Sequence, residues 1–193
     1  MDLIRTVLEL IRQKLNASLA ATEDWVILSN IVDQEGHPYA DAKDKIVMVL
    51  ANIKYETTIS THNPTVRTKT SLDAVVAPPL YIDLYILFYA NFYDNNYRQG
   101  LAMISRTISF FQQTPWFTAD NMPGLPPVID KLTMEITNLD LLEANYLMGM
   151  LGAKYLPSVF YKLRLLPFAG DAIMDVTPAV AGDDTKEQPK STR

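Results

Sequence analysis

Histidines are the first residues to consider for chemistry, because imidazole is the most frequent general base and a common metal ligand. The chain has two, His37 and His62, and each lies close to a proline in a segment predicted to be a loop. Neither has a second ligand at the spacing of a metal-binding motif. The chain has no cysteine, which excludes disulfides, thiolate metal sites and cysteine nucleophiles. Neither histidine is therefore predicted to bind a metal or to act in catalysis.

Asp83 is the most unusual carboxylate, because it interrupts an apolar run in which a charge is costly unless it is paired. A perturbed general acid or base is one interpretation. We favour the other, an aspartate at a sheet edge or a subunit contact that is bonded to the backbone or to an arginine. Asp41 and Asp44 could bind a cation, but their surroundings favour a solvated turn.

Signatures of the common enzyme classes do not occur in the sequence. It contains no Gly-x-Ser-x-Gly nucleophile elbow, no phosphate-binding loop and no Gly-x-Gly-x-x-Gly motif. The glycines at 149 and 152 are interpreted as the end of a helix. We expect no enzymatic activity, no cofactor and no metal. A rival interpretation, an enzyme with an unfamiliar site, requires a deep pocket with converging polar groups.

Length and composition describe an ordinary globular chain. Its 193 residues, 48% hydrophobic and 20% charged, suffice for one domain with its own core. The net charge of −5 argues against nucleic-acid binding, which favours a basic face. No uncharged apolar run reaches the roughly 18 residues of a membrane span, and Asp2 and Glu9 argue against a secretory signal. We expect a protein that folds in the cytoplasm and does not insert into a membrane.

Hydrophobic periodicity predicts three helices. Apolar residues recur every three or four positions over residues 3–19, 93–111 and 139–151, and Pro115 cannot continue the second helix. The apolar stripe of the second helix consists of Tyr93, Tyr97, Leu101, Ile104, Ile108 and Phe111. The stripe of the third consists of Leu142, Tyr146 and Met150.

Apolar runs predict five strands, at residues 25–32, 45–59, 80–91, 129–136 and 159–166. The third is largely apolar on both faces, which is typical of a central strand. Adjacent strands early in the chain favour antiparallel pairing, whereas helices between later strands allow crossovers. We predict a single α+β domain with a mixed, mostly antiparallel sheet of about five strands, packed by the three helices.

Two polar segments are predicted to lie outside this core. Residues 60–76, rich in Thr and Ser and containing Arg67 and Lys69, are interpreted as a long exposed loop. Residues 170–193 contain too little apolar surface to offset their ordering entropy. We therefore predict a domain at residues 1–169 that is followed by a disordered tail.

Aromatic residues provide most of the candidate contact surface. Tyr81, Tyr85 and Tyr89 line one face of the predicted central strand, either as a partner surface or as core residues under the helices. Trp116 and Phe117 lie on a predicted loop, which either folds back on the core, as we favour, or docks on another chain. With Arg67 and Lys69, these aromatic residues are the candidate interface.

Residues 78–117 carry a resemblance to a known family. The stretches PPLYIDLY, LFYANF, YRQGL and ISFFQQTP, with LTME at 132–135 and GAKYLPSVFYK at 152–162, resemble the tail-terminator, or cap, family of extracellular contractile injection systems. These phage-tail-like machines include the antifeeding prophage and the Photorhabdus virulence cassettes. The resemblance covers about residues 1–168 and depends on length and order, not on a catalytic signature.

The resemblance implies a structural assembly protein. Its subunits would form a hexameric ring on the last layer of inner tube and sheath, end polymerisation and hold the sheath to the tube. The partners would be further copies of the chain, the inner tube protein and the sheath protein. The protein would be cytoplasmic during assembly and then part of the particle, and residues 60–76 would be an arm toward a neighbour or the sheath. Alternatives are another ring or baseplate-type adaptor of the same machine, and a monomeric binding module that uses the tyrosine face.

Overall fold

The structure is a computed structural model, and it describes residues 2–19, 23–56, 65–67, 72–76, 80–168 and 173–178. The chain forms two compact units. The first contains Met1–Ile59 and Leu80–Phe168, and the second contains Ser60–Pro79 and Ala169–Arg193.

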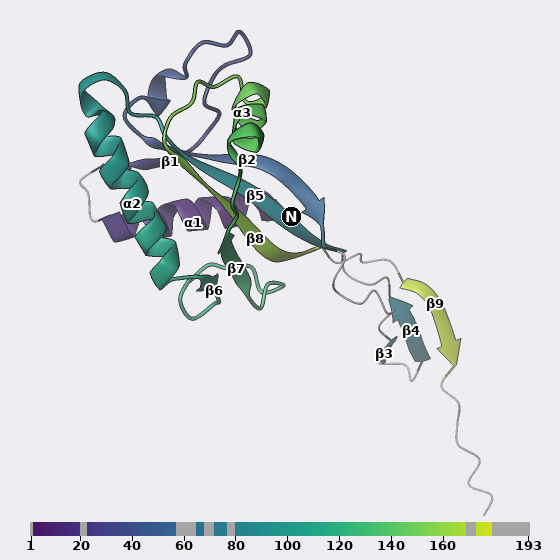
Figure 1. The fold of residues 1–193 in the computed structure, drawn as a ribbon. Coiled ribbons are helices and arrows are strands. Elements are labelled where there is room, and N and C mark those ends of the chain that lie inside the picture. Colours follow the sequence, from purple (N-terminus) through teal and green to yellow (C-terminus); the bar gives the residue numbers. More distant parts are fainter. Residues whose placement is uncertain are drawn as a thin grey trace, which may run out of the picture. The chain divides into compact units, whose positions relative to one another are not determined.

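Six strands of the first unit form a mixed sheet (Figure 1). Their order across the sheet is β1 (Val26–Leu28), β2 (Ile46–Tyr55), β5 (Leu80–Ala90), β8 (Ser158–Phe168), β7 (Leu132–Ile136) and β6 (Trp116–Phe117). β1 runs parallel to β2, and every other neighbouring pair is antiparallel. The predicted α+β class and mostly antiparallel sheet are confirmed. The sixth strand is β6, which falls within the stretch predicted to be a loop.

Three α-helices pack this sheet: α1 (Leu3–Leu19), α2 (Tyr97–Gln113) and α3 (Leu141–Met150). Two short 3-10 helices, η1 (Ala40–Ala42) and η2 (Asp94–Asn96), lie in the connections. α2 ends before Pro115, as predicted. α3 begins with a capping box, in which the Asp140 carboxylate accepts from the Glu143 N–H and the Glu143 carboxylate accepts from the Asp140 N–H.

The sheet divides the core into two layers, because successive side chains of a strand point to opposite faces. On one face Ile86 and Phe88 of β5 pack with buried side chains of α1 and α2. On the other face Leu87 and Tyr89 pack with Met148 of α3. Figure 1 shows α1 behind the strands and α3 in front of them. β5 lies between β2 and β8, so the predicted central strand is confirmed.

The second unit contains a sheet in the order β3 (Thr65–Arg67), β4 (Leu72–Val76) and β9 (Ile173–Pro178), with antiparallel pairs. The prediction of an irregular loop at residues 60–76 is therefore wrong for β3 and β4. β9 lies within residues 170–193, and the disordered tail predicted there stays a prediction. Pairing between β4 and β9 satisfies backbone groups of two segments that are far apart in the sequence, which local composition does not reveal. The division of the chain at residue 169 stays a prediction.

Candidate interaction surfaces

The three predicted tyrosines of β5 differ in accessibility. Tyr89 is buried, and its hydroxyl donates to the Lys154 carbonyl over 2.6 Å. Burial raises the pKa of Tyr89 to about 12. Tyr81 and Tyr85 are half-buried, and the Tyr85 ring lies 5.7 Å from the Phe160 ring, centroid to centroid. Tyr81 and Tyr85 therefore stay candidate contact residues, whereas Tyr89 belongs to the core.

Trp116 and Phe117 also differ in accessibility. They are neighbours in β6, so alternation places them on opposite faces of the sheet. Phe117 is fully buried and Trp116 is exposed, with the Lys131 ammonium 5.1 Å from the Trp116 ring centroid. Phe117 is thus a core residue and only Trp116 remains a candidate contact. Arg67 lies in β3, but its side chain is outside the described residues, as is the whole of Lys69.

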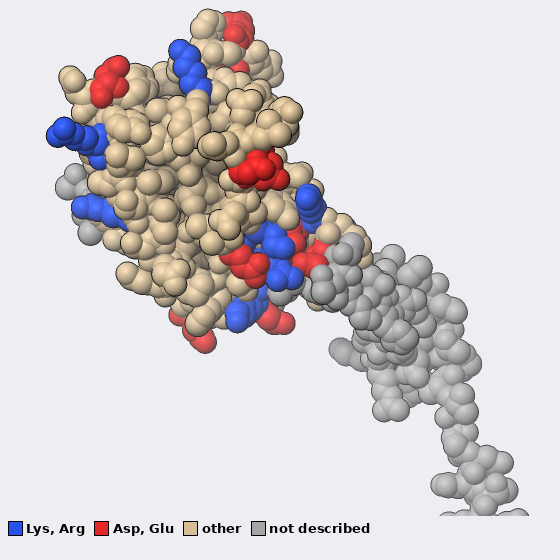
Figure 2. Space-filling view, in the orientation of Figure 1, with Lys and Arg blue, Asp and Glu red and all other residues tan. Residues whose placement is uncertain are grey.

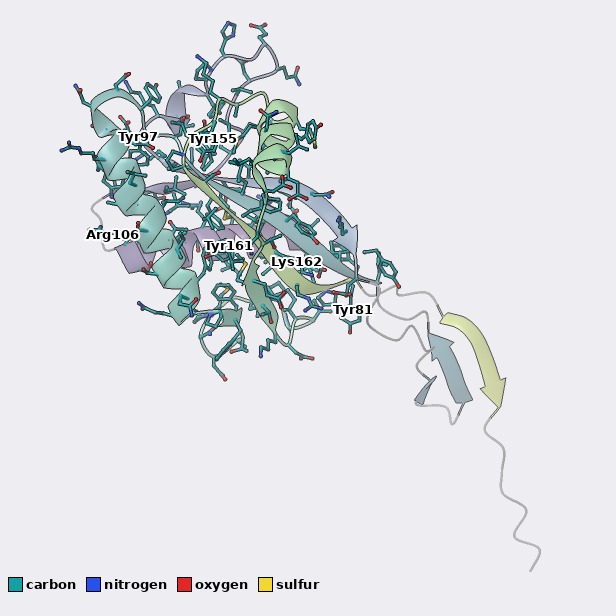
Figure 3. All side chains as sticks on the ribbon, in the orientation of Figure 1. Tyr81, Tyr97, Arg106, Tyr155, Tyr161 and Lys162 are labelled. Carbon is teal, nitrogen blue, oxygen red and sulfur yellow. The ribbon has the colours of Figure 1, made fainter. Side chains whose placement is uncertain are left out.

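Asp83 belongs to a group of three ion pairs made by two basic residues of β8. Its carboxylate lies 3.4 Å from the Lys162 ammonium, measured between Oδ2 and Nζ. Arg164 binds Glu56 at 3.0 Å and Glu135 at 3.2 Å. Hydrogen bonds to these two carboxylates raise the pKa of Arg164. Figure 2 shows this mixture of charges, and Figure 3 labels Lys162 within it.

These pairs correct the interpretation of Asp83. The sequence favoured a sheet edge or subunit contact, but Asp83 lies on the central strand β5. Lys162 of the adjacent strand β8 forms an ion pair with it. Its charge is balanced across the sheet, so Asp83 is interpreted as a structural residue that joins β5 to β8.

His37 lies in a turn with two carboxylates, contrary to the prediction that it has no second ligand. Its Nδ1 is 3.4 Å from Asp33 Oδ2 and 3.5 Å from Glu35 Oε2. Ligand atoms of the three exposed side chains all fall within 4.8 Å of one another. The His37 N–H also donates to Asp33, which lowers the pKa of that carboxyl. The turn hydrogen bonds account for this cluster without an ion.

The other candidate ligands are dispersed. Asp41 is exposed in η1, in agreement with a solvated turn, whereas Asp44 is half-buried. Asp44 adopts a left-handed φ of 55°, and its N–H donates to the Asn91 carbonyl. His62 lies outside the described residues.

α3 exposes most of its apolar surface. Its predicted stripe of Leu142, Tyr146 and Met150 points to solvent, and the one buried residue of the helix is Met148. We define the α3 patch as five large side chains that are 59–87% exposed: Leu141, Leu142, Tyr146, Met150 and Tyr155. Tyr146 and Tyr155 help to line an open groove of about 720 Å³. The predicted helix is confirmed, and its stripe stays exposed because α3 is apolar on nearly every side and the sheet covers only one of them.

α2 carries a second exposed apolar group. Its buried side is formed by Gly100, Met103, Ile104, Thr107 and Phe111. The predicted stripe is therefore right for Ile104 and Phe111 and wrong for the rest. We define the α2 patch as Tyr97, Leu101 and Ile108, which are 38–44% exposed.

The charged residues of α2 are both basic. They are Arg98 and Arg106, and both are exposed. Figure 2 shows basic side chains along the left edge, over α2, and Figure 3 labels Tyr97 and Arg106 on the helix.

Across the described residues, the surface of this α+β domain presents exposed apolar patches and paired charges. The described helices include none that is long and apolar enough to cross a membrane. The chain belongs to the Pvc16 N-terminal domain family, whose family model matches residues 6–182. This match confirms the resemblance seen in the sequence and continues past residue 168, where that resemblance ended.

Two solved structures share the fold. The first is the sheath/tube terminator of the PVC extracellular contractile injection system in its extended state, with a TM-score of 0.65 and 14% identity over 98% of this chain and 65% of that one. The second is the tube-terminating cap of the anti-feeding prophage, with a TM-score of 0.58 and 13% identity over 96% of this chain and 60% of that one. The chain thus spans less than two thirds of the length of either. No curated protein matches it.

Proposed function

We propose that this chain is a non-enzymatic terminator component that caps the inner tube and sheath of a contractile injection system. The observation that carries the proposal is the likeness of nearly the whole chain to two terminators, over 98% and 96% of its length. The surface is compatible with assembly, because exposed apolar patches are typical of contacts between proteins. An enzyme would instead require a pocket with converging polar groups.

In this function the subunits form a hexameric ring on the last layer of tube and sheath. The ring ends polymerisation and joins the sheath to the tube, so its partners are further copies of the chain, the inner tube protein and the sheath protein. Assembly takes place in the cytoplasm, and the cap then stays in the particle. A cyclic ring uses a heterologous contact, in which two different surfaces of each subunit meet. The α2 and α3 patches are two such surfaces, built from different elements.

The test is to image particle ends with and without this protein. Without it, we expect tubes and sheaths of uncontrolled length that still carry a baseplate, and the wild-type chain supplied in trans should restore uniform lengths. A baseplate-type adaptor would behave differently, because its loss would remove the baseplate end. Normal capped particles in the absence of the protein would refute the proposal.

We also propose that the segment at residues 60–76, which contains β3 and β4, is an arm that contacts a neighbour or the sheath. Its deletion should abolish capping while the six-stranded sheet stays folded, as measured by circular dichroism. The control is the same assay on the intact chain. Capped particles formed by the deletion variant would exclude the arm.

A further inference from the structure

We propose that the α3 patch of one subunit docks on the α2 patch of the next copy of this chain, in a head-to-tail contact. The inference rests on the proposed function, because it identifies the surfaces by which subunits of the cap join. Both patches belong to the first compact unit, so the argument concerns that unit alone.

α3 has the composition of a helix that is covered on more than one side. Its sequence LLEANYLMGM contains a single charged residue, Glu143. A helix that is apolar nearly all round is normally buried. In the subunit the sheet buries only Met148, and Leu141, Leu142, Tyr146 and Met150 are left in solvent. A contiguous exposed apolar patch of this kind marks a contact surface.

The two patches lie on helices that cover opposite faces of the sheet. Phe111 of α2 packs in the layer that contains Phe88, whereas Met148 of α3 packs in the layer that contains Leu87. One subunit therefore presents the two patches in different directions. A head-to-tail contact uses two different surfaces, whereas a two-fold contact uses one surface twice. The arrangement favours the head-to-tail contact.

Charge distinguishes the same two possibilities. α2 carries Arg98 and Arg106 and no acidic residue. The α3 patch is flanked by Asp140 and Glu143 at the start of the helix, against one ammonium, Lys154, that lines the groove. Contact of α3 with α2 brings opposite charges together, whereas α2–α2 or α3–α3 contacts bring like charges together, which costs affinity and suppresses the wrong pairing.

Cross-linking tests the contact directly, because the chain has no native cysteine. Leu101→Cys places one thiol in the α2 patch and Leu142→Cys places one in the α3 patch. Val128→Cys, at an exposed loop position, is the matched control. Each full-length variant, an equal mixture of the first two and the double variant are treated with a short bismaleimide, in solution and on assembled particles. Circular dichroism verifies that each variant is folded.

A head-to-tail contact gives a distinctive pattern of products. Each single variant alone gives no cross-linked product. The mixture of Leu101→Cys and Leu142→Cys gives a cross-linked dimer and nothing larger, and the double variant gives a ladder of cross-linked oligomers. Dimers from Leu142→Cys alone would overturn the inference in favour of a two-fold contact. A mixture that gives no more product than Val128→Cys, both in solution and on particles, would also overturn it.

A charge variant separates this inference from the proposed function. For this variant the two cysteines are Leu101→Cys and Met150→Cys, because position 142 is needed for a charge. Leu142→Lys and Tyr146→Lys are then added to the same chain. They put like charge opposite the arginines of α2. We expect loss of the ladder and loss of capping, and Arg98→Glu with Arg106→Glu in the same chain should restore both. A ladder that persists overturns the contact even where particles stay capped. If the ladder forms but particles made without this protein have normal ends, the contact is supported and the capping function is refuted.

Discussion

Replacing Gly100 by alanine should destabilise the protein, even though alanine is the better helix former. Gly100 is buried on the inner side of α2, where an added Cβ would lie 2.8 Å from the Cβ of Phe92. Phe92 is itself buried and stacks on Trp25, with 6.1 Å between ring centroids. The ring is held by the core, so α2 or the segment before it must shift to accept the methyl group.

The magnitude follows from two opposing effects. Alanine in a helix interior is worth up to about 1 kcal/mol over glycine. Overpacking of a well-packed core costs about 1–3 kcal/mol. Where alanine gives its full helix gain, the net effect of Gly100→Ala is a loss of up to about 2 kcal/mol. Gly149→Ala in α3 is the matched control, because a Cβ at this position meets no atom within 4 Å. It keeps only the favourable effect, which is at most about 1 kcal/mol.

Denaturant unfolding of the full chain, followed by far-ultraviolet circular dichroism, measures both changes. The two variants should move the unfolding midpoint in opposite directions, down for Gly100→Ala and up or unchanged for Gly149→Ala. In a thermal scan each kcal/mol corresponds to about 2–4 °C for a chain of this size. If Gly100→Ala stabilised the protein as Gly149→Ala does, the close packing of α2 against Phe92 would be wrong.

Three other perturbations test the core, the cap of α3 and its exposed side. Burial raises the pKa of Tyr89 from 10.0 to about 12. Between these two pH values the unfolded state has lost a proton that the folded state retains, so the free energy of unfolding should fall by roughly 3 kcal/mol as the pH rises. Tyr89→Phe should flatten this fall in a pH series of denaturation curves, and should cost about 1 kcal/mol at neutral pH because the bond to the Lys154 carbonyl is lost. Leu15→Ala, at a fully buried position, should lower the free energy of unfolding by about 2–5 kcal/mol, whereas Leu142→Ala should change it by no more than about 0.5 kcal/mol. Equal losses would mean that α3 is buried in the isolated chain. Asp140→Ala should cost about 1 kcal/mol through loss of the capping box, and unchanged stability together with unchanged helix content would contradict the role of the cap.

Several elements were predictable because their signals are local. Val7 and Ile11 recur at helical spacing, and both are buried in α1. The paired apolar faces of residues 80–91 predicted a central strand, and β5 occupies that place. Pro115 has no backbone N–H to donate and cannot continue a helix, and α2 ends just before it, at Gln113. The family resemblance was visible for a related reason, since it depends on the order of such segments along the chain.

The direction in which a side chain faces was less predictable where both sides of an element are apolar. The stripe of Leu142, Tyr146 and Met150 has helical spacing, yet only one side of α3 meets the sheet, and that side carries Met148. Similarly, composition could not separate Trp116 from Phe117. Their alternation became informative only once β7 paired with them as a strand.

The helices, the main strands and the family could be recognised from the amino-acid order, because each depends on residues that are near one another in the chain. The pairing of β4 with β9 and the ion pair between Lys162 and Asp83 required the folded structure, because these partners meet only when distant segments fold together. The folded structure also decided which apolar residues stay uncovered. Burial depends on how much surface the neighbouring elements can cover, and in this chain they leave the α2 and α3 patches in solvent.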